Sequence, residues 1–213
     1  MSPRPYRLGQ RQVATDQTRN RIVEAARELL ASEGGLAGFS VDAVARQADV
    51  ARMTVYYQFR SRLGLLEAVF DDLAGRGGME GMPAVFTTPD ALRALDLFIG
   101  VFCRFWATDP VVMRRLRGAG AVDPELGDGL QAREDRREQG LRVLIGRLPD
   151  RPEGALDADA AVDLLHSLTS FDTYERLART RTTQEVEAVL RRSARALLGP
   201  VADQAGVCSI DEQ

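Results

Sequence analysis

A short stretch near the amino end, residues 48–62, combines residue types that suit contact with a polyanion. It reads ADVARMTVYYQFRSR and contains two adjacent tyrosines, a threonine and three arginines. Hydroxyl and guanidinium groups donate hydrogen bonds to phosphate oxygens, and a methionine gives apolar contact to a thymine methyl group. The same stretch carries Val55 and Phe59 at a spacing that suits burial on one face of a helix. This chemistry points to nucleic-acid binding.

Two short helices joined by a tight turn would position these groups. Residues 41–48 and 52–58 have helical spacing and are separated by a turn, which is the arrangement of a helix-turn-helix unit. Val55 would face the core, whereas Met53 and Tyr57 would point away from it, since successive residues turn by about 100° around a helix. The second helix is therefore predicted to lie between a protein core and a polyanion.

The exposed side of this unit supplies the candidate DNA-contacting residues. A helix in the major groove offers its N-terminal residues to base edges, so we assign Arg52 and Met53 to base contact. Hydroxyl groups and helix N-termini meet phosphates. We assign Thr54, Tyr56 and Tyr57 to phosphate or sugar contact and Arg62 to a further phosphate. The set of DNA-binding candidates also includes Ser40 and Val41. Taken alone, any of them has an ordinary structural interpretation, such as a core tyrosine for Tyr56.

The distribution of charge supports a basic amino end. The chain of 213 residues has a formal net charge of −3. Residues 1–62 contain ten arginines and six acidic residues, a net charge of +4, whereas residues 63–213 have a net charge of −7. The basic residues are all arginines, because the sequence has no lysine. This asymmetry suggests a polyanion-binding front attached to an acidic body.

These residues resemble the N-terminal domain of the TetR family of transcriptional regulators. The similarity covers residues 16–73, and especially FSVDAVARQADVARMTVYYQFRSRLGLL. It implies that the helix over residues 52–58, the third of this domain, is the recognition helix. It also implies that Arg62 is the basic residue that opens the fourth helix. Two places depart from the family pattern: Asp49 replaces the usual turn glycine, and Leu63 and Gly64 replace an acid and a helix former. Aspartate is among the residues that tolerate left-handed geometry.

The whole sequence predicts an all-α fold. Periodic apolar segments are separated by glycine and proline, and no alternation typical of strands occurs. Among the later helices we expect one over residues 89–108, one over residues 157–179, and a last one opened by a capping box of Thr182 with Glu185. The charged run REDRRE at residues 133–138 is interpreted as a solvated face.

The prediction divides the chain into four parts. They are a flexible basic arm at residues 1–14, a helix-turn-helix DNA-binding domain at 15–60, a larger helical ligand-binding and dimerisation domain at 61–200, and a flexible tail at 201–213. The two roles of the larger domain, and a four-helix bundle between the last two long helices of two subunits, are implied by the resemblance. Arg4, Arg7 and Arg11 either enter an adjacent minor groove or only raise the local cation density.

The aromatic-rich helix over residues 89–108 is the candidate wall of a small-molecule pocket, because such pockets are mostly apolar. The candidate lining residues are Phe98, Phe102, Trp106, Met113, His166 and Tyr174. For each of them plain core packing is the simpler interpretation. His166 in particular is expected to be a hydrogen-bonded core histidine.

The leading hypothesis is a homodimeric repressor that binds palindromic operator DNA and is released by a small, mostly apolar effector. A ligand-independent DNA-binding protein is an alternative with the same amino end. A helical enzyme is a third, but one histidine and two separated cysteines leave acid–base or nucleophilic chemistry without partners. We therefore predict no catalytic residue, metal site or cofactor. The absence of a long apolar run predicts a cytoplasmic protein with no membrane partner.

Overall fold

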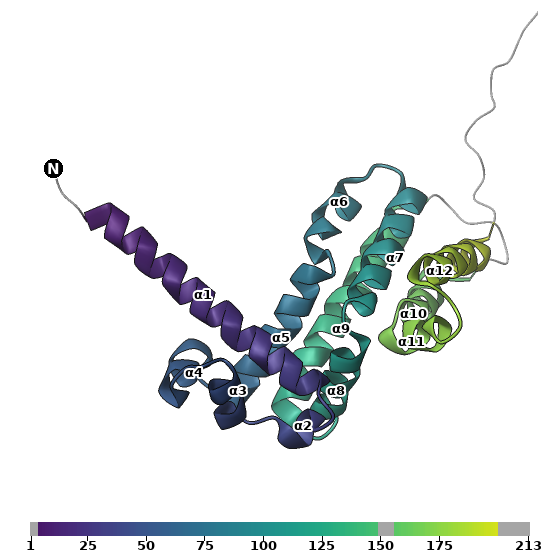
Figure 1. Cartoon of the computed structure of the whole chain (residues 1–213). Coiled ribbons are helices and arrows are strands. Elements are labelled where there is room, and N and C mark those ends of the chain that lie inside the picture. The colour runs from purple at the N-terminus through teal and green to yellow at the C-terminus, as the bar shows by residue number, and fades with distance from the viewer. Residues whose placement is uncertain (1–3, 149–155, 200–213) are drawn as a thin grey trace, which may run out of the picture. The chain divides into compact units, whose positions relative to one another are not determined.

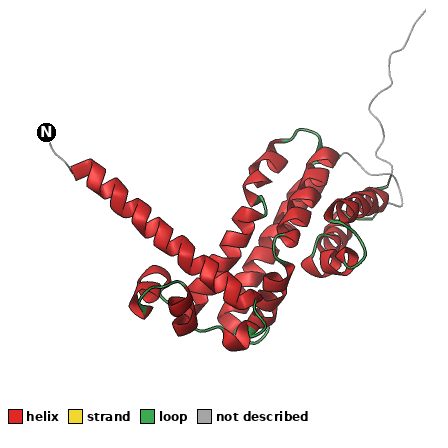
Figure 2. Cartoon of the chain, in the orientation of Figure 1, coloured by secondary structure: helices red, strands yellow, loops and turns green. Residues whose placement is uncertain are grey.

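The computed structural model describes residues 4–148 and 156–199, and every regular element in those ranges is a helix (Figure 1). Figure 2 accordingly shows no strand in this part of the chain. The predicted all-α class is confirmed. No helix within the described ranges is both long and apolar enough to cross a lipid bilayer. The predicted tail at 201–213 lies outside the described residues.

The helices group into two contact units, the first formed by the chain up to Met79 together with Arg104–Glu134. Its helices are α1 (Arg4–Ala31), α2 (Gly35–Gly38), α3 (Val41–Gln47), α4 (Arg52–Phe59), α5 (Arg62–Arg76) and α8 (Pro110–Gly120). From the boundary onward follow the 3-10 turn η1 (Met79–Gly81), α6 (Met82–Thr87), α10 (Ala158–Leu168), α11 (Phe171–Ala178) and α12 (Thr183–Leu198). Two helices, α7 (Ala91–Ala107) and α9 (Pro124–Ile145), each contribute residues to both units.

The apolar face of α1 organises the first unit. Ile22, Ala26 and Leu30 have no exposed surface, and their spacing of four places them on one side of the helix. α1 packs against α3, α5 and α8. Figure 1 shows α3 and α4 beside α1. This packing attaches the helix-turn-helix unit, formed by α3 and α4, to the core.

The predicted flexible arm at residues 1–14 is helical from Arg4 onward, because α1 already begins there. The segment over residues 4–14 contains arginine, leucine, glutamine and alanine, which are good helix formers, and Pro5 lies in the first turn, where proline is tolerated. Residues 12–17 are exposed. At these exposed positions no side chain is buried, so the apolar period that marks the rest of α1 is absent there.

Two arginine interactions attach α8 to α1. Arg27 on α1 donates to the carboxylate of Asp109, the N-cap of α8, at 2.7 Å. Arg115 on α8 reaches the other way and donates to the carbonyl oxygens of Leu30 and Ser32. Each arginine thus meets the end of the other helix, and Arg115 supplies a donor to the Leu30 carbonyl in the last turn of α1, where carbonyls lack partners within the helix.

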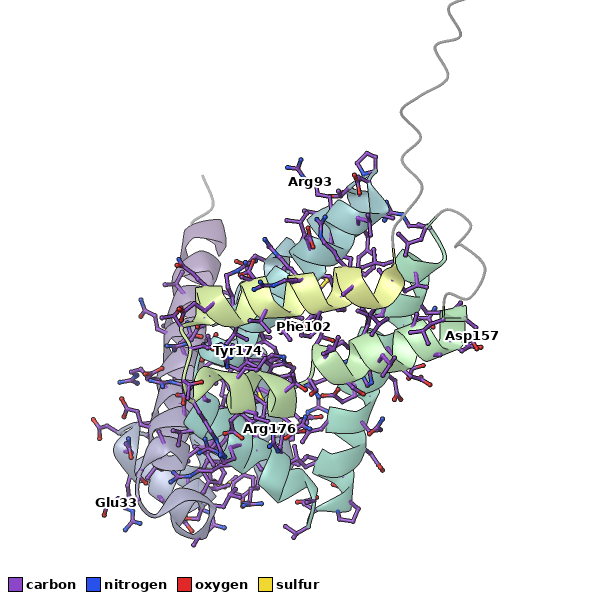
Figure 3. All side chains as sticks on the ribbon, turned by 90° about the vertical axis from the view of Figure 1, so that its right-hand side faces the viewer. Glu33, Arg93, Phe102, Asp157, Tyr174 and Arg176 are labelled. Atoms are coloured by element: carbon purple, nitrogen blue, oxygen red, sulfur yellow. The ribbon has the colours of Figure 1, made fainter. Side chains whose placement is uncertain are left out.

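The expected helix over residues 157–179 is two helices, α10 and α11, which meet at Thr169 and Ser170. Asp157 caps α10, and Figure 3 shows it at the start of that helix. The hydroxyl of Thr169 donates back to the carbonyl of Leu165 at 2.8 Å, while the hydroxyl of Ser170 accepts from a first-turn amide of α11. Hydroxyl side chains that bond the local backbone compete with helix continuation, and this explains the break.

Several helix starts follow the sequence signals closely. Thr182 and Glu185 form the predicted capping box of α12, and the hydrogen bond from the Thr182 backbone lowers the pKa of Glu185. α7 begins at Ala91, two residues later than the expected start at residue 89. There Asp90 accepts from the backbone amide of Arg93 at 2.9 Å.

Only part of the charged run at residues 133–138 is the solvated face that the sequence suggests, because Asp135 and Arg136 are exposed and Arg137 is buried. Arg137 is only 4% exposed and donates to the carbonyl of His166 at 2.6 Å and to the hydroxyl of Thr169 at 2.7 Å. Its guanidinium carbon lies 5.7 Å from the centre of the Phe102 ring. Because a buried charge is costly unless it is hydrogen-bonded, these contacts make Arg137 a structural residue of the second unit.

Replacing Asp109 with Ala should destabilise the protein more than replacing it with Asn. Asn keeps an acceptor for the backbone amide of Val112, which Asp109 accepts at 3.2 Å, whereas Ala leaves that amide unpaired. Loss of an N-cap costs about 0.5–2 kcal/mol. Urea unfolding of both variants measures the difference, and Arg27→Ala measures the ion pair that both of them lose. Equal stability of the Ala and Asn variants would contradict the capping role.

Candidate nucleic-acid interface

A tight turn sets the angle between α3 and α4. The amide of Val50 donates to the carbonyl of Ala45 at 3.0 Å, and the amide of Asp49 donates to the carbonyl of Arg46 at 3.3 Å. Asp49 has a φ of 51°, in the left-handed region. These are the two hydrogen bonds of a Schellman motif, which satisfies carbonyls at a helix end. Asp49 therefore adopts the geometry for which glycine is usual.

The helix that follows the turn, α4, buries one face and exposes the other. Val55 is 1% exposed and Phe59 is 5% exposed. Met53 and Tyr57, on the opposite side, are 72% and 86% exposed. The predicted orientation of all four side chains is confirmed. Large apolar groups that stand side by side in water mark a surface that meets a partner.

An open hollow lies on this exposed side of α4. It has a volume of about 510 Å³ and is lined by Met53, Thr54, Tyr56 and Tyr57. Thr54 and Tyr56 are half-buried at its flanks. The surface thus combines thioether and ring carbon atoms with hydroxyl groups. This combination suits a DNA groove, whose floor carries thymine methyl groups and whose walls carry phosphates.

Arg52, in the first turn of α4, is held by two neighbours. Its guanidinium donates to the carboxylate of Asp42 at 3.1 Å and to the hydroxyl of Tyr56 at 3.3 Å. The hydrogen bond to Tyr56 and the charge of Asp42 raise the pKa of Arg52. Since the Tyr56 hydroxyl accepts from Arg52, its own proton stays available for a phosphate oxygen. The sequence did not single out Asp42, because an acid in a first helical turn is ordinary.

Arg19 on α1 is a second residue that the sequence did not single out. It donates to the carbonyl of Gln58 at 3.2 Å and its guanidinium lies 4.5 Å from the centre of the Phe59 ring. Carbonyl groups at the end of a helix lack partners within it, and a cation is favourable there. Arg19 thus attaches the C-terminal end of α4 to α1.

The junction between α4 and α5 is equally constrained. The amide of Ser61 donates to the carbonyl of Phe59 at 2.7 Å around Arg60, whose φ is 65°, which makes a γ-turn. Ser61 then caps α5 by accepting from the amide of Gly64 at 3.0 Å. A Cβ atom at Gly64 would lie 2.2 Å from the carbonyl oxygen of Phe59. Glycine at this position therefore has a steric reason.

The remaining predicted DNA-contacting residues lie at the ends of these helices. Ser40 is exposed and caps α3 by accepting from a backbone amide at 3.1 Å. Val41 is only 7% exposed, so its side chain packs in the core beside Val44, and a side-chain contact with DNA is excluded. Arg62 is half-buried, with its guanidinium 5.4 Å from the centre of the Phe39 ring.

The candidate ligand-lining residues do not come together in one unit. Phe98, Phe102, His166 and Tyr174 belong to the second unit, and Trp106 and Met113 belong to the first. All are buried except His166, which is half-buried. The rings of Phe98 and Phe102 lie 4.7 Å apart, and the hydroxyl of Tyr174, labelled on α11 in Figure 3, lies 3.0 Å from that of Thr183. These contacts are core packing, and ligand binding by these residues stays a prediction.

The sequence of the helix-turn-helix unit and its neighbouring helices matches a known protein family. Residues 22–69 match the model of the bacterial regulatory proteins of the tetR family. Residues 22–69 therefore form a DNA-binding domain of the TetR family of transcriptional regulators. The matched residues include the buried face of α1, the helix-turn-helix unit and the first half of α5. Members of this family are DNA-binding transcription factors and not enzymes.

Solved structures of other regulators have a similar fold. A TetR-family regulator from Rhodococcus sp. shares 19% identity at a TM-score of 0.69 over 86% of this chain and 100% of that one. A TetR regulator from Haloarcula marismortui shares 18% identity at a TM-score of 0.67, over 86% of this chain and 97% of that one. A regulator from Saccharomonospora viridis in complex with choline shares 18% identity at a TM-score of 0.64, over 83% of this chain and 95% of that one. No curated protein matches the chain.

Replacing Gly64 with Ala should destabilise the protein by about 1–3 kcal/mol, because the new methyl group has to displace the Phe59 carbonyl. Thermal unfolding followed by circular dichroism measures the effect. Gly75→Ala is the matched control on the same helix, since a Cβ atom there meets nothing within 4 Å. The control should be neutral or slightly stabilising. Equal effects of the two substitutions would rule out the steric explanation.

Proposed function

We propose that this TetR-family protein is a homodimeric repressor that binds a palindromic operator through α4 and leaves it when a small, mostly apolar effector binds. The outward face of α4 carries the proposal. Met53 and Tyr57 are 72% and 86% exposed there, on a helix whose other face is held by Val55 and Phe59. Exposure of this kind is unfavourable in water and favourable against a groove that supplies methyl, sugar and phosphate groups.

The rigid attachment of α4 supports binding without rearrangement. Its N-terminal end follows a Schellman turn at Asp49, and its C-terminal end is held by Arg19 and by the close approach of Phe59 to Gly64. A surface that is already ordered loses less conformational entropy on binding than a flexible one does. The recognition helix can therefore enter the major groove in its present conformation, with Arg52 and Met53 toward the bases.

A homodimer follows from what one α4 can read. A single recognition helix contacts few base pairs, whereas a two-fold dimer reads two half-sites and multiplies the discrimination. We assign the dimer contact to the last helices of the second unit. In the single chain Leu164 on α10 is 43% exposed, which is unfavourable unless a partner covers it.

The proposed effector would act on the second unit, in the region of Phe98 and Phe102. An effector shifts the population only as far as its affinities for the DNA-binding and released conformations differ. The similar regulator from Saccharomonospora viridis binds choline, which makes choline a reasonable first probe for this chain. The dense packing of Phe98, Phe102 and Tyr174, which are at most 6% exposed, favours the alternative of a ligand-independent DNA-binding regulator.

Selection from random duplex DNA with the purified protein should recover a palindrome. On that DNA Arg62→Ala should reduce the slope of the logarithm of the binding constant against the logarithm of the salt concentration by about one unit. The reason is that the variant lacks one positive charge that would release a counterion from a DNA phosphate. Tyr57→Ala should weaken binding at every salt concentration and leave the slope unchanged, since tyrosine carries no charge. Fluorescence anisotropy at several salt concentrations measures both quantities.

Val122→Ala is the control, because Val122 is 84% exposed and lies outside the helix-turn-helix unit. It should change neither the affinity nor the slope. Wild-type affinity of Tyr57→Ala and Arg62→Ala at all salt concentrations would contradict the proposed interface.

An effector should raise the thermal midpoint of the free protein and release it from the selected palindrome. Choline and a panel of small apolar compounds are screened first by thermal shift, because a ligand that binds the folded state stabilises it. Each compound that shifts the midpoint is then added to the protein–DNA complex. Release at the same concentration supports an effector-controlled repressor. Stabilisation without release supports the ligand-independent alternative.

A further inference from the structure

We propose that Asp42 is a positioning residue for reading DNA sequence, because it holds the Arg52 guanidinium in the orientation that pairs with a guanine in the major groove. The inference rests on the proposed DNA-binding function. It adds to that function a residue from α3, which lies beside α4 in Figure 1, and it names the base that is read.

The geometry of the pair leaves suitable donors free for a base. Nη1 of Arg52 donates to Asp42 and Nη2 donates to Tyr56. A guanidinium group has five N–H donors, so these two contacts leave one further N–H on each terminal nitrogen and one on Nε. Bidentate pairing with O6 and N7 of guanine needs two donors in the plane of the group. The two anchors thus orient the guanidinium without using its capacity to read guanine.

The exposure of the ion pair argues against a purely structural role. The side chains of Arg52 and Asp42 are 57% and 55% exposed. An exposed ion pair of this kind contributes little to folding stability. The α3–α4 turn is already determined by its Schellman hydrogen bonds and by the burial of Val44 and Val55. The pair is therefore not needed to hold the two helices together.

The sign of the Asp42 charge points the same way. A carboxylate on a surface that faces phosphates lowers the affinity for any DNA, whatever its sequence. Such a residue is favourable for a regulator only when it raises discrimination between sequences. Arg side chains lose rotamer entropy when they are fixed. Asp42 and Tyr56 restrict Arg52 before DNA arrives, so the correct base recovers more of the pairing energy.

Variants of the full-length protein test this on the palindrome selected from random DNA. For each variant the affinity is measured for the palindrome, for the palindrome with each base pair exchanged in turn, and for random duplex. Arg52→Ala should lose the preference for guanine at one position of each half-site, by about five- to 150-fold. Asp42→Ala should weaken the preference at that same position by at least about threefold, while its affinity for random duplex stays equal or rises.

The double variant Asp42→Ala with Arg52→Ala separates positioning from direct contact, since two residues that act as a unit are not additive. It should show the same base preference as Arg52→Ala alone. Glu33→Ala is the charge-matched control: Glu33 is exposed and extends from the turn after α1 (Figure 3). This control should keep the wild-type preference. Asp42→Asn retains an acceptor oxygen and should keep part of the preference.

Three results would overturn the proposal. The first is a wild-type guanine preference in Asp42→Ala. The second is an effect of Asp42→Ala that persists in the absence of Arg52, since Asp42 would then contact a base itself, for instance a cytosine amino group. The third is a base preference that Arg52→Ala leaves unchanged. Failure of the wild-type protein to select any sequence overturns the proposed function as well, so the two failures are distinguishable. Thermal unfolding of each variant confirms that it is folded.

Discussion

The burial of Val55 and Phe59 is the contact on which the exposed face of α4 depends. α4 has eight residues, and a helix of that length is not stable by itself in water. Its conformation and its orientation therefore both come from the core that receives these two side chains. Because they point inward, Met53 and Tyr57 on the other side have to point outward. One packing interaction thus stabilises the helix and also determines which of its side chains are exposed.

Each end of α4 is fixed by a residue whose backbone conformation is rare for any residue other than glycine. Asp49 before the helix and Arg60 after it both have positive φ, and each such residue costs about 1–2 kcal/mol. Conformations of this kind persist where the surrounding structure determines them, and they concentrate at functional sites. Here the surroundings are a Schellman turn on one side and the close approach of Phe59 to Gly64 on the other. The strain is consistent with a helix held in one orientation for recognition.

Local signals in the sequence were sufficient to predict much of the structure around α4. Helical period predicted which sides of α4 are buried and exposed, and side-chain chemistry predicted the capping box of α12. Contacts between distant residues were beyond such signals. Arg19 and Gln58 are 39 residues apart, and Asp42 meets Arg52 only because the turn folds α3 onto α4. Arg137 is buried for the same reason, since a charged run shows no sign of the helix that will cover it.

The charges of the chain favour discrimination over raw affinity. A net charge of +4 over residues 1–62 is modest for a surface that meets a polyanion, and the chain as a whole carries −3. Non-specific binding depends almost entirely on the number of cations placed against phosphates, so few cations and an acid at Asp42 keep that component small. Occupancy of one site in a genome depends on the ratio of specific to non-specific affinity, because non-specific sites are in great excess. A regulator with a weakly basic front and a rigid recognition helix therefore gains selectivity from the same features that limit its affinity for random DNA.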